Sequence, residues 1–120
     1  MKATSGQTDV VLAGELEIRP AESLALAGGR PLTFSVREWR VLTVLAGRPD
    51  RIVSRDQLYE EAWGAPLRPG DRSVDVYVHK VRAKLEQALP AWRFIHTHVG
   101  FGYRFEPERS HGFHMDTTSR

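Results

Sequence analysis

The apolar residues of one segment recur at helical spacing, and they constrain the fold of this 120-residue chain more than any other feature. Five aliphatic residues follow one another at intervals of three or four positions: Val74, Val78, Val81, Leu85 and Leu89. This spacing places them on one side of an α-helix, and that side must be buried against other elements. Asp71 is expected to cap the helix, which is predicted over residues 72–88.

Two shorter helices are predicted before this one, each opened by a capping serine. Ser35 precedes the first and Ser54 the second, and a Glu or Gln three residues later completes the spacing of a capping box. Gly47 and Gly64 end the two helices. Their buried faces consist of Trp39, Leu42, Leu45 and Ala46 in the first, and of Leu58, Ala62 and Trp63 in the second.

Extended segments flank the three helices. Four short apolar runs, separated by Gly- and Pro-containing turns, lie at residues 10–12, 16–18, 24–26 and 32–34. They predict an antiparallel sheet of three or four strands, with Gly28-Gly29 as a tight turn. After Pro90, two runs joined around Gly100 predict a β-hairpin over residues 93–105. The expected fold class is therefore α+β: an N-terminal antiparallel sheet, three helices and a C-terminal hairpin.

The composition is that of a single globular domain, with 41% hydrophobic and 27% charged residues. We assign the domain to residues 10–106, a linker or tail to 1–9, and a flexible tail to 107–120, because both ends lack an apolar period. The chain contains no cysteine and no run of the ~18 apolar residues that a membrane span needs. We expect a cytoplasmic protein without a membrane partner or a cofactor.

The face of the 72–88 helix opposite the valines carries most of the segment's cations, although the net charge of the whole chain is only +2. These residues are Arg72, His79, Lys80, Arg82 and Lys84. Such a face is typical of helices that read the major groove, because cations neutralise phosphates while shorter side chains meet base edges. A solvated charged face is the alternative for any single helix, but the preceding short helix and the following hairpin favour a helix-turn-helix unit.

Several linked motifs between Leu16 and Phe105 resemble the winged-helix DNA-binding domains of OmpR/PhoB-type response regulators. The motifs are Ser35–Leu42, with an aromatic residue after the Glu; Arg51–Leu58 followed by Ala62-Trp63-Gly64; Arg72–Val78 with Val81–Leu85; and Ile95–Thr97 with Gly100–Phe105. The resemblance implies a bacterial transcription regulator of two-component (phosphorelay) signalling that binds double-stranded DNA. The 72–88 helix would enter the major groove, and the hairpin, the family's wing, would lie on the flanking backbone or minor groove.

The resemblance also implies a role for individual residues. Those expected to face bases are Asp75, Val76, His79 and Lys80. Those expected to face phosphates are Trp63, Arg72, Ser73, Tyr77, Arg82, Lys84, Thr97 and Tyr103. The loop 64–71, with Leu67 and Arg68, matches the position through which family members engage RNA polymerase. A homodimer on tandem DNA sites is a further expectation.

The sequence departs from the family pattern at three places. His98 and Val99 stand where the family commonly places a wing arginine, which leaves minor-groove reading by this wing open. His79 replaces a frequent arginine, so binding could depend on pH near the ordinary histidine pKa of ~6.5. The family's receiver domain, about another 120 residues, is absent, and the polar start Lys2–Asp9 favours a fragment of a longer protein.

Three other functions are alternatives to DNA binding. His96, His98, His111 and His114 could hold zinc, but companion carboxylates or cysteines at ligand spacing are lacking, so no metal is expected. No nucleophile elbow, phosphate loop or metalloprotease signature is present, so catalysis is not expected. A protein-interaction module with the same fold and little DNA affinity is the remaining alternative, favoured by the low net charge.

Overall fold

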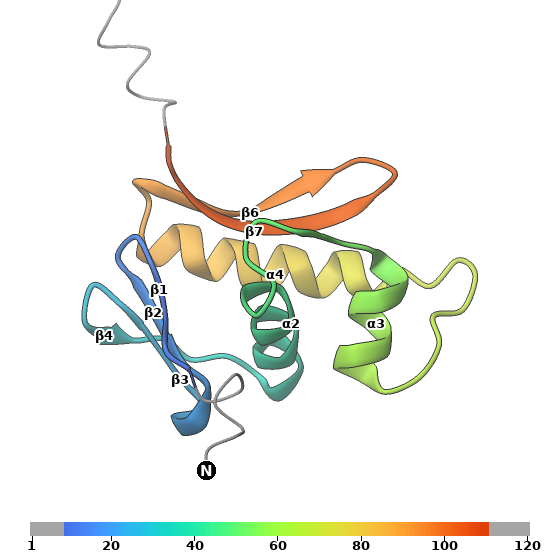
Figure 1. Cartoon of the computed structure of the whole chain (residues 1–120), viewed down its shortest axis with the longest axis horizontal. Coiled ribbons are helices and arrows are strands. Elements are labelled where there is room, and N and C mark those ends of the chain that lie inside the picture. Colours follow the sequence, from blue (N-terminus) through green and yellow to red (C-terminus); the bar gives the residue numbers. More distant parts are fainter. Residues whose placement is uncertain (1–8, 111–120) are drawn as a thin grey trace, which may run out of the picture.

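The computed structural model describes residues 9–110 and shows two antiparallel sheets around three α-helices (Figure 1). The N-terminal sheet has the strand order β1-β2-β3-β4, and the second sheet has the order β5-β7-β6. The strands are β1 Val11–Ala13, β2 Leu16–Arg19, β3 Leu24–Ala27, β4 Arg30–Pro31, β5 Ile52–Val53, β6 Trp92–His98 and β7 Gly102–Arg109. The helices are η1 Pro20–Glu22, a 3-10 turn, and α2 Val36–Ala46, α3 Arg55–Trp63 and α4 Ser73–Ala88.

Helix α4 lies at the centre of the molecule, between α2 and the β6–β7 hairpin (Figure 1). Its aliphatic stripe is buried, with Val74, Val81 and Leu85 at 0% exposure and Val78 at 1%. Leu89 follows the end of the helix and is buried as well. The predicted helix and its buried face are confirmed, and the expected fold class, sheet, three helices and hairpin, is the one observed.

The helix starts agree with the capping pattern in one case and differ in two. Ser35 and Glu38 form the complete capping box of α2. At α3 the Ser54 hydroxyl accepts a bond from the Gln57 N–H, but the Gln57 side-chain amide donates to Glu61 instead of closing the box. At α4 the prediction of Asp71 as N-cap was wrong.

Arg72 occupies the N-cap position of α4, and the helix begins at Ser73. The Asp71 carboxylate accepts bonds from the backbone N–H of Ser73 at 2.8 Å and from its hydroxyl at 2.6 Å. These two bonds lower the pKa of Asp71 below its ordinary value. Asp71 therefore stabilises the first turn from one residue further out than predicted.

Three strand boundaries also differ from the prediction. The fourth N-terminal strand is Arg30–Pro31, directly after the Gly28-Gly29 turn, and residues 32–34 are not part of the sheet. β5 was not predicted, because two residues are too few to show a period of two. β7 continues to Arg109, so residues 107–109, assigned above to the tail, belong to the sheet. Of the predicted linker 1–9 and the predicted tail 107–120, residues 1–8 and 111–120 lie outside the described residues.

Gly102 lets β5 approach the β6–β7 hairpin. Its φ is +144°, a conformation that residues with a side chain rarely adopt. A Cβ atom at this position would collide with the carbonyl oxygen of Val53 and would lie 2.9 Å from the Cα of Ser54. The pairing of β5 with β7 therefore requires glycine here.

We expect Gly102→Ala to lower the free energy of unfolding by at least about 3 kcal/mol, because backbone strain and a backbone collision act together. Gly100→Ala is the matched control, since Gly100 also has a positive φ of +84° but no atom within 4 Å of the added Cβ. Its expected cost is about 1–2 kcal/mol. Urea unfolding of both variants measures the difference, and equal losses would show that the contact with β5 does not constrain the hairpin.

Candidate nucleic-acid interface

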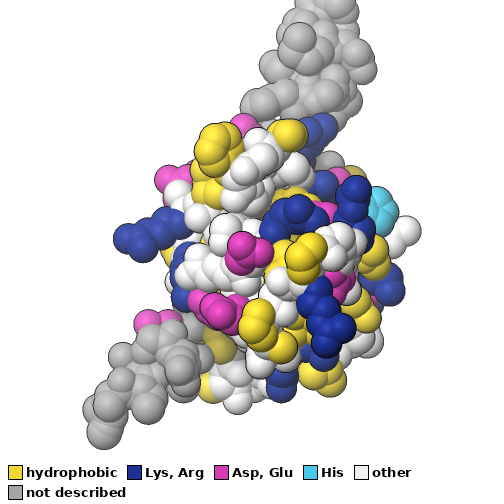
Figure 2. Space-filling view, turned by 90° about the vertical axis from the view of Figure 1, so that its right-hand side faces the viewer, with side chains coloured by type: hydrophobic (Ala, Val, Ile, Leu, Met, Phe, Trp, Pro, Cys, Tyr) yellow, Lys and Arg dark blue, Asp and Glu magenta, His cyan; other side chains and the backbone are white. Residues whose placement is uncertain are grey.

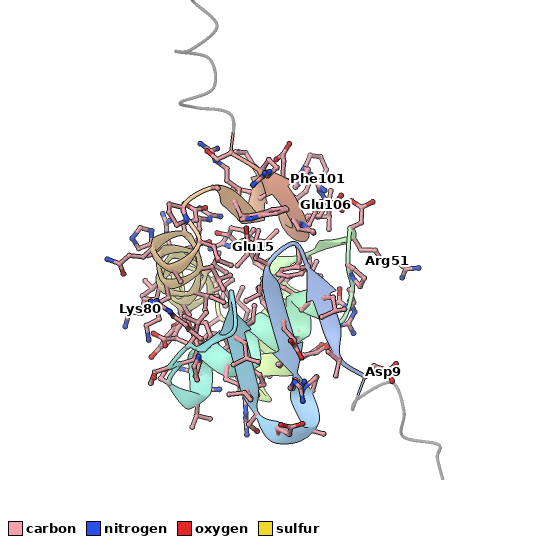
Figure 3. The ribbon with its side chains drawn as sticks, turned by 90° about the vertical axis from the view of Figure 1, so that its left-hand side faces the viewer. Asp9, Glu15, Arg51, Lys80, Phe101 and Glu106 are labelled. Carbon is pink, nitrogen blue, oxygen red and sulfur yellow. The ribbon has the colours of Figure 1, made fainter. Side chains whose placement is uncertain are left out.

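The exposed side of α4 forms a continuous stripe opposite the buried valines. We call Arg72, Val76, His79, Lys80 and Ala83 the outer stripe; all five are exposed. They follow helical spacing, so they lie on one face. Lys80 projects outward from α4 (Figure 3), and its ammonium lies 4.8 Å from the centre of the Tyr77 ring. The stripe thus combines cations with small apolar side chains.

Asp75 is not part of the outer stripe, although the sequence predicted that it faces bases. Its carboxylate accepts a bond from Arg55 at 2.7 Å, and the Tyr103 hydroxyl donates to its other oxygen. Arg72 lies 3.9 Å away. Asp75 therefore links α4 to α3 and β7, and its acceptor oxygens are used inside the protein.

Tyr103, which the sequence predicted to face a phosphate, is also bonded within the protein. The residue is 8% exposed, and its hydroxyl is the donor to Asp75. Burial raises the pKa of Tyr103, and the bond to the Asp75 carboxylate raises it further, to about 12. Tyr103 and Asp75 are thus bonded to each other within the protein, and the DNA contacts expected of both stay predictions.

Lys84 was predicted to face phosphates, but it is bound at the start of α2. Its ammonium donates to the Glu38 carboxylate at 2.7 Å and to the carbonyl oxygen of Thr33 at 3.0 Å. Glu38 is 6% exposed. Burial alone would raise the pKa of Glu38, but the bonds from Lys84 and from the Ser35 N–H hold it below its ordinary value. This ion pair joins α4 to α2.

Arg82 and Thr97 occupy the surface where α4 meets the hairpin. The Arg82 guanidinium donates to the Thr97 hydroxyl at 2.7 Å and lies 6.0 Å from the centre of the Tyr103 ring. Thr97 is exposed and Arg82 is half-buried. Arg82 and Thr97, which are both predicted to contact phosphates, are therefore neighbours at the surface.

Trp63 belongs to an aromatic cluster between the helices. Its ring stacks on Tyr59 with 4.6 Å between centroids and meets the Tyr77 ring edge-on at 5.5 Å. The Arg37 guanidinium lies 4.8 Å above the Trp63 ring. Sequence reasoning missed Arg37 and Arg55, because each sits in the first turn of a helix and no spacing signals a partner twenty or more residues away.

The remaining predicted site residues lie at the start of α4 and in the preceding loop. Ser73 donates its hydroxyl to Asp71. In the loop 64–71, Leu67 is half-buried and Arg68 is exposed. Both line an open hollow of about 530 Å³ between the loop and the first turn of α3.

The histidines considered for zinc have other neighbours. His96 Nε2 is 2.9 Å from the carbonyl oxygen of Glu106, and His98 Nε2 accepts a bond from Arg104 at 3.0 Å. His111 and His114 lie outside the described residues. Within residues 9–110, no three potential ligand side chains are grouped as a metal site. Over the same range, no helix has the length and apolar character needed to cross a bilayer.

Residues 29–105 match the family described as "Transcriptional regulatory protein, C terminal". The chain belongs to this family, the OmpR/PhoB-type DNA-binding domains. The chain is 36% identical over 99 residues to the alkaline phosphatase synthesis transcriptional regulatory protein SphR of Synechococcus elongatus, with 82% of this chain and 38% of SphR covered. It is 34% identical over 90 residues to the phosphate regulon transcriptional regulatory protein PhoB of Escherichia coli, with 75% and 39% covered.

The solved structures include OmpR/PhoB-type domains of the same fold. The Klebsiella pneumoniae RstA DNA-binding domain in complex with RstA box matches with a TM-score of 0.73 and 30% identity, over 82% of this chain and 97% of that domain. The recognition of a winged-helix domain from the sequence is thereby confirmed. The chain spans about two fifths of the length of the curated relatives it matches.

We expect Asp75→Asn to lower the free energy of unfolding of this OmpR/PhoB-type domain by about 1–2 kcal/mol, because Arg55 and Tyr103 lose a charged acceptor. Asp56→Asn removes an exposed carboxylate from the first turn of α3 and should change stability by no more than about 0.5 kcal/mol. The pKa of Tyr103 should also fall in Asp75→Asn. Urea unfolding and alkaline absorbance titration measure the two effects; an unchanged tyrosine titration would contradict the link.

Proposed function

We propose that this domain binds double-stranded DNA with sequence specificity, with α4 in the major groove and the β6–β7 hairpin on the flanking backbone. The outer stripe of α4 is the observation that carries the proposal. A helix held by its buried face, with cations and small side chains on the opposite face, fits the width of a major groove. The relatives named above are transcriptional regulators, and the RstA domain was crystallised with a DNA box.

The charge distribution supports the same orientation. Figure 2 shows the end of the molecule that carries α3 and the turn of the hairpin, and Lys and Arg side chains are concentrated on one half of it. Most of the Asp and Glu side chains in this view lie on the other half. A local excess of positive charge attracts the phosphate backbone even where the net charge of the chain is small.

The geometry narrows the set of contacts that we propose. Val76, His79 and Lys80 face bases, because they lie on the outer stripe. Arg72, Arg82 and Thr97 face phosphates. Ser73 and Tyr77 in the first half of α4, and Trp63 at the end of α3, do so as well. We propose no DNA contact for Asp75, Tyr103 and Lys84, because their polar atoms are bonded to other parts of the protein.

Selection from a random duplex library tests the proposal and supplies the unknown site. The selected duplex should bind with an affinity that falls with salt at a log–log slope of roughly −5, as expected for about six phosphate contacts. A chain that selects no sequence and shows no salt dependence would instead be the protein-interaction module of the same fold.

We further propose that the domain forms the DNA-binding part of a cytoplasmic bacterial response regulator that binds tandem sites as a dimer. The relatives of similar sequence are longer than this chain, which supports a parent protein with an additional domain. We also propose that the loop 64–71, in which Arg68 is exposed, contacts RNA polymerase, as the family pattern implies for this position.

We predict that Lys80→Ala weakens binding to the selected site by about 1–3 kcal/mol and relaxes specificity at one base pair. Arg82→Ala should weaken binding to all sequences similarly and reduce the salt slope by about one. Lys84→Ala is the matched control: it removes a cation from the same helix whose ammonium is bound to Glu38, so the slope should stay unchanged. Titration of fluorescent duplexes at several salt concentrations measures the affinity and the salt slope of the three variants. A reduced slope for Lys84→Ala would show that Lys84 contacts a phosphate after all.

We predict that Arg68→Ala, in the loop, reduces transcription from a promoter carrying the selected site while leaving duplex affinity within about twofold, as expected of a loop residue that contacts the polymerase and not DNA. Transcription with purified bacterial polymerase and duplex titration separate the two effects. A parallel loss of affinity would place Arg68 on DNA instead.

A further inference from the structure

We propose that the tip of the β6–β7 hairpin, Val99-Gly100-Phe101, is an apolar wedge that enters the minor groove and selects deformable base steps. The inference rests on the proposed function, because it adds a second recognition element beside α4. It differs from recognition by a cation: residues 98–102 contain no Lys or Arg.

The hairpin tip exposes two large apolar side chains, whereas large apolar side chains further along the two strands are buried. Val99 is 87% exposed and Phe101 is 73% exposed. Phe94 and Phe105, further along the two strands, are each 1% exposed. Adjacent exposed apolar side chains at the end of a projecting element mark a contact surface.

The backbone of the hairpin tip holds these side chains in place. The N–H of Phe101 donates to the carbonyl oxygen of His98 at 2.8 Å, and Gly100 has a φ of +84°. This is a type II turn, in which glycine takes the position of positive φ. A wedge on a closed turn loses little conformational freedom on binding, so its burial contributes more to affinity.

The position of the hairpin tip fits a groove next to the one occupied by α4. The bond from Arg82 to Thr97 and the bond from Tyr103 to Asp75 attach the hairpin to α4. Val99 lies two residues beyond Thr97, a reach of about 7 Å at strand rise. Figure 1 shows this turn projecting at the end of the molecule, and Figure 3 shows Phe101 on the hairpin. Arg82 and Thr97 would contact the phosphates that separate the two grooves.

The chemistry of the hairpin tip determines which DNA it favours. A cationic tip binds more tightly to a narrow A-tract minor groove, because the negative potential there attracts it. This tip has no Lys or Arg and lacks that attraction. An apolar side chain such as Phe acts by partly unstacking a base step, which costs least at pyrimidine–purine steps such as TA. The contact of Arg82 with Thr97, close to the tip along β6, favours DNA over a second protein as the occupant, because it places a cation beside the wedge.

The test compares three hairpin variants with a matched surface control. The probe is the duplex recovered by selection, as a single site, with 2-aminopurine at the base step flanking the α4 contact on the hairpin side. Phe101→Ser should weaken binding about tenfold and abolish the rise in 2-aminopurine fluorescence that reports unstacking. Val99→Ser should weaken binding less, and Phe101→Leu should keep most of the affinity. Leu12→Ser, at a β1 residue that is 74% exposed, should bind like the wild type.

The outcomes separate the inference from the proposed function. Unchanged binding and fluorescence in Phe101→Ser, with a wild type that binds, would overturn the wedge alone. A loss seen only on tandem sites, and absent on the single site, would overturn it too, because the tip would then contact a neighbouring protein. No salt-dependent binding by the wild type would overturn the proposed function and the wedge together. A preference for TA over AT at the flanking step, lost in Phe101→Ser, supports the wedge.

Discussion

The burial of the valine stripe of α4 is the constraint on which the rest of the structure depends. Each aliphatic side chain taken out of water contributes about 1.5–3 kcal/mol, and the stripe is covered by α2 on one side and by β6 on the other. A helix buried along one face cannot rotate about its own axis without exposing that face. The same burial therefore determines which residues form the outer stripe.

Polar links then divide the charged residues of α4 into internal and external groups. Asp75 is bonded to α3 and β7, and Lys84 is bonded to α2, so each pins the helix to a neighbour. His79 and Lys80, which lie between them in the sequence, stay exposed. Asp75 is the acidic residue in the first half of α4, and its carboxylate is bonded to Arg55 and Tyr103. The exposed side chains of this part of the helix are therefore cationic or uncharged.

Much of the fold could be predicted from short-range patterns. The valine spacing, the serine caps and the double glycine each act over a few residues, and the elements they predict are present. β5 has no local signal, since its two residues become a strand only by pairing with β7. The extension of β7 past Phe105 is of the same kind, because its residues pair with the start of β6.

By itself the sequence determined the elements, the buried face of α4 and the family, because periodicity, caps and linked motifs are properties of neighbouring residues. Only the tertiary structure decided which of the predicted contact residues are bonded to distant parts of the protein. Asp75, Tyr103 and Lys84 carry the right chemistry for DNA, but their partners are 20 to 51 positions away along the chain. Hydrogen bonds and ion pairs depend on distance in space. The residue type therefore shows that a side chain can form a polar contact, but only the fold shows which residue is its partner.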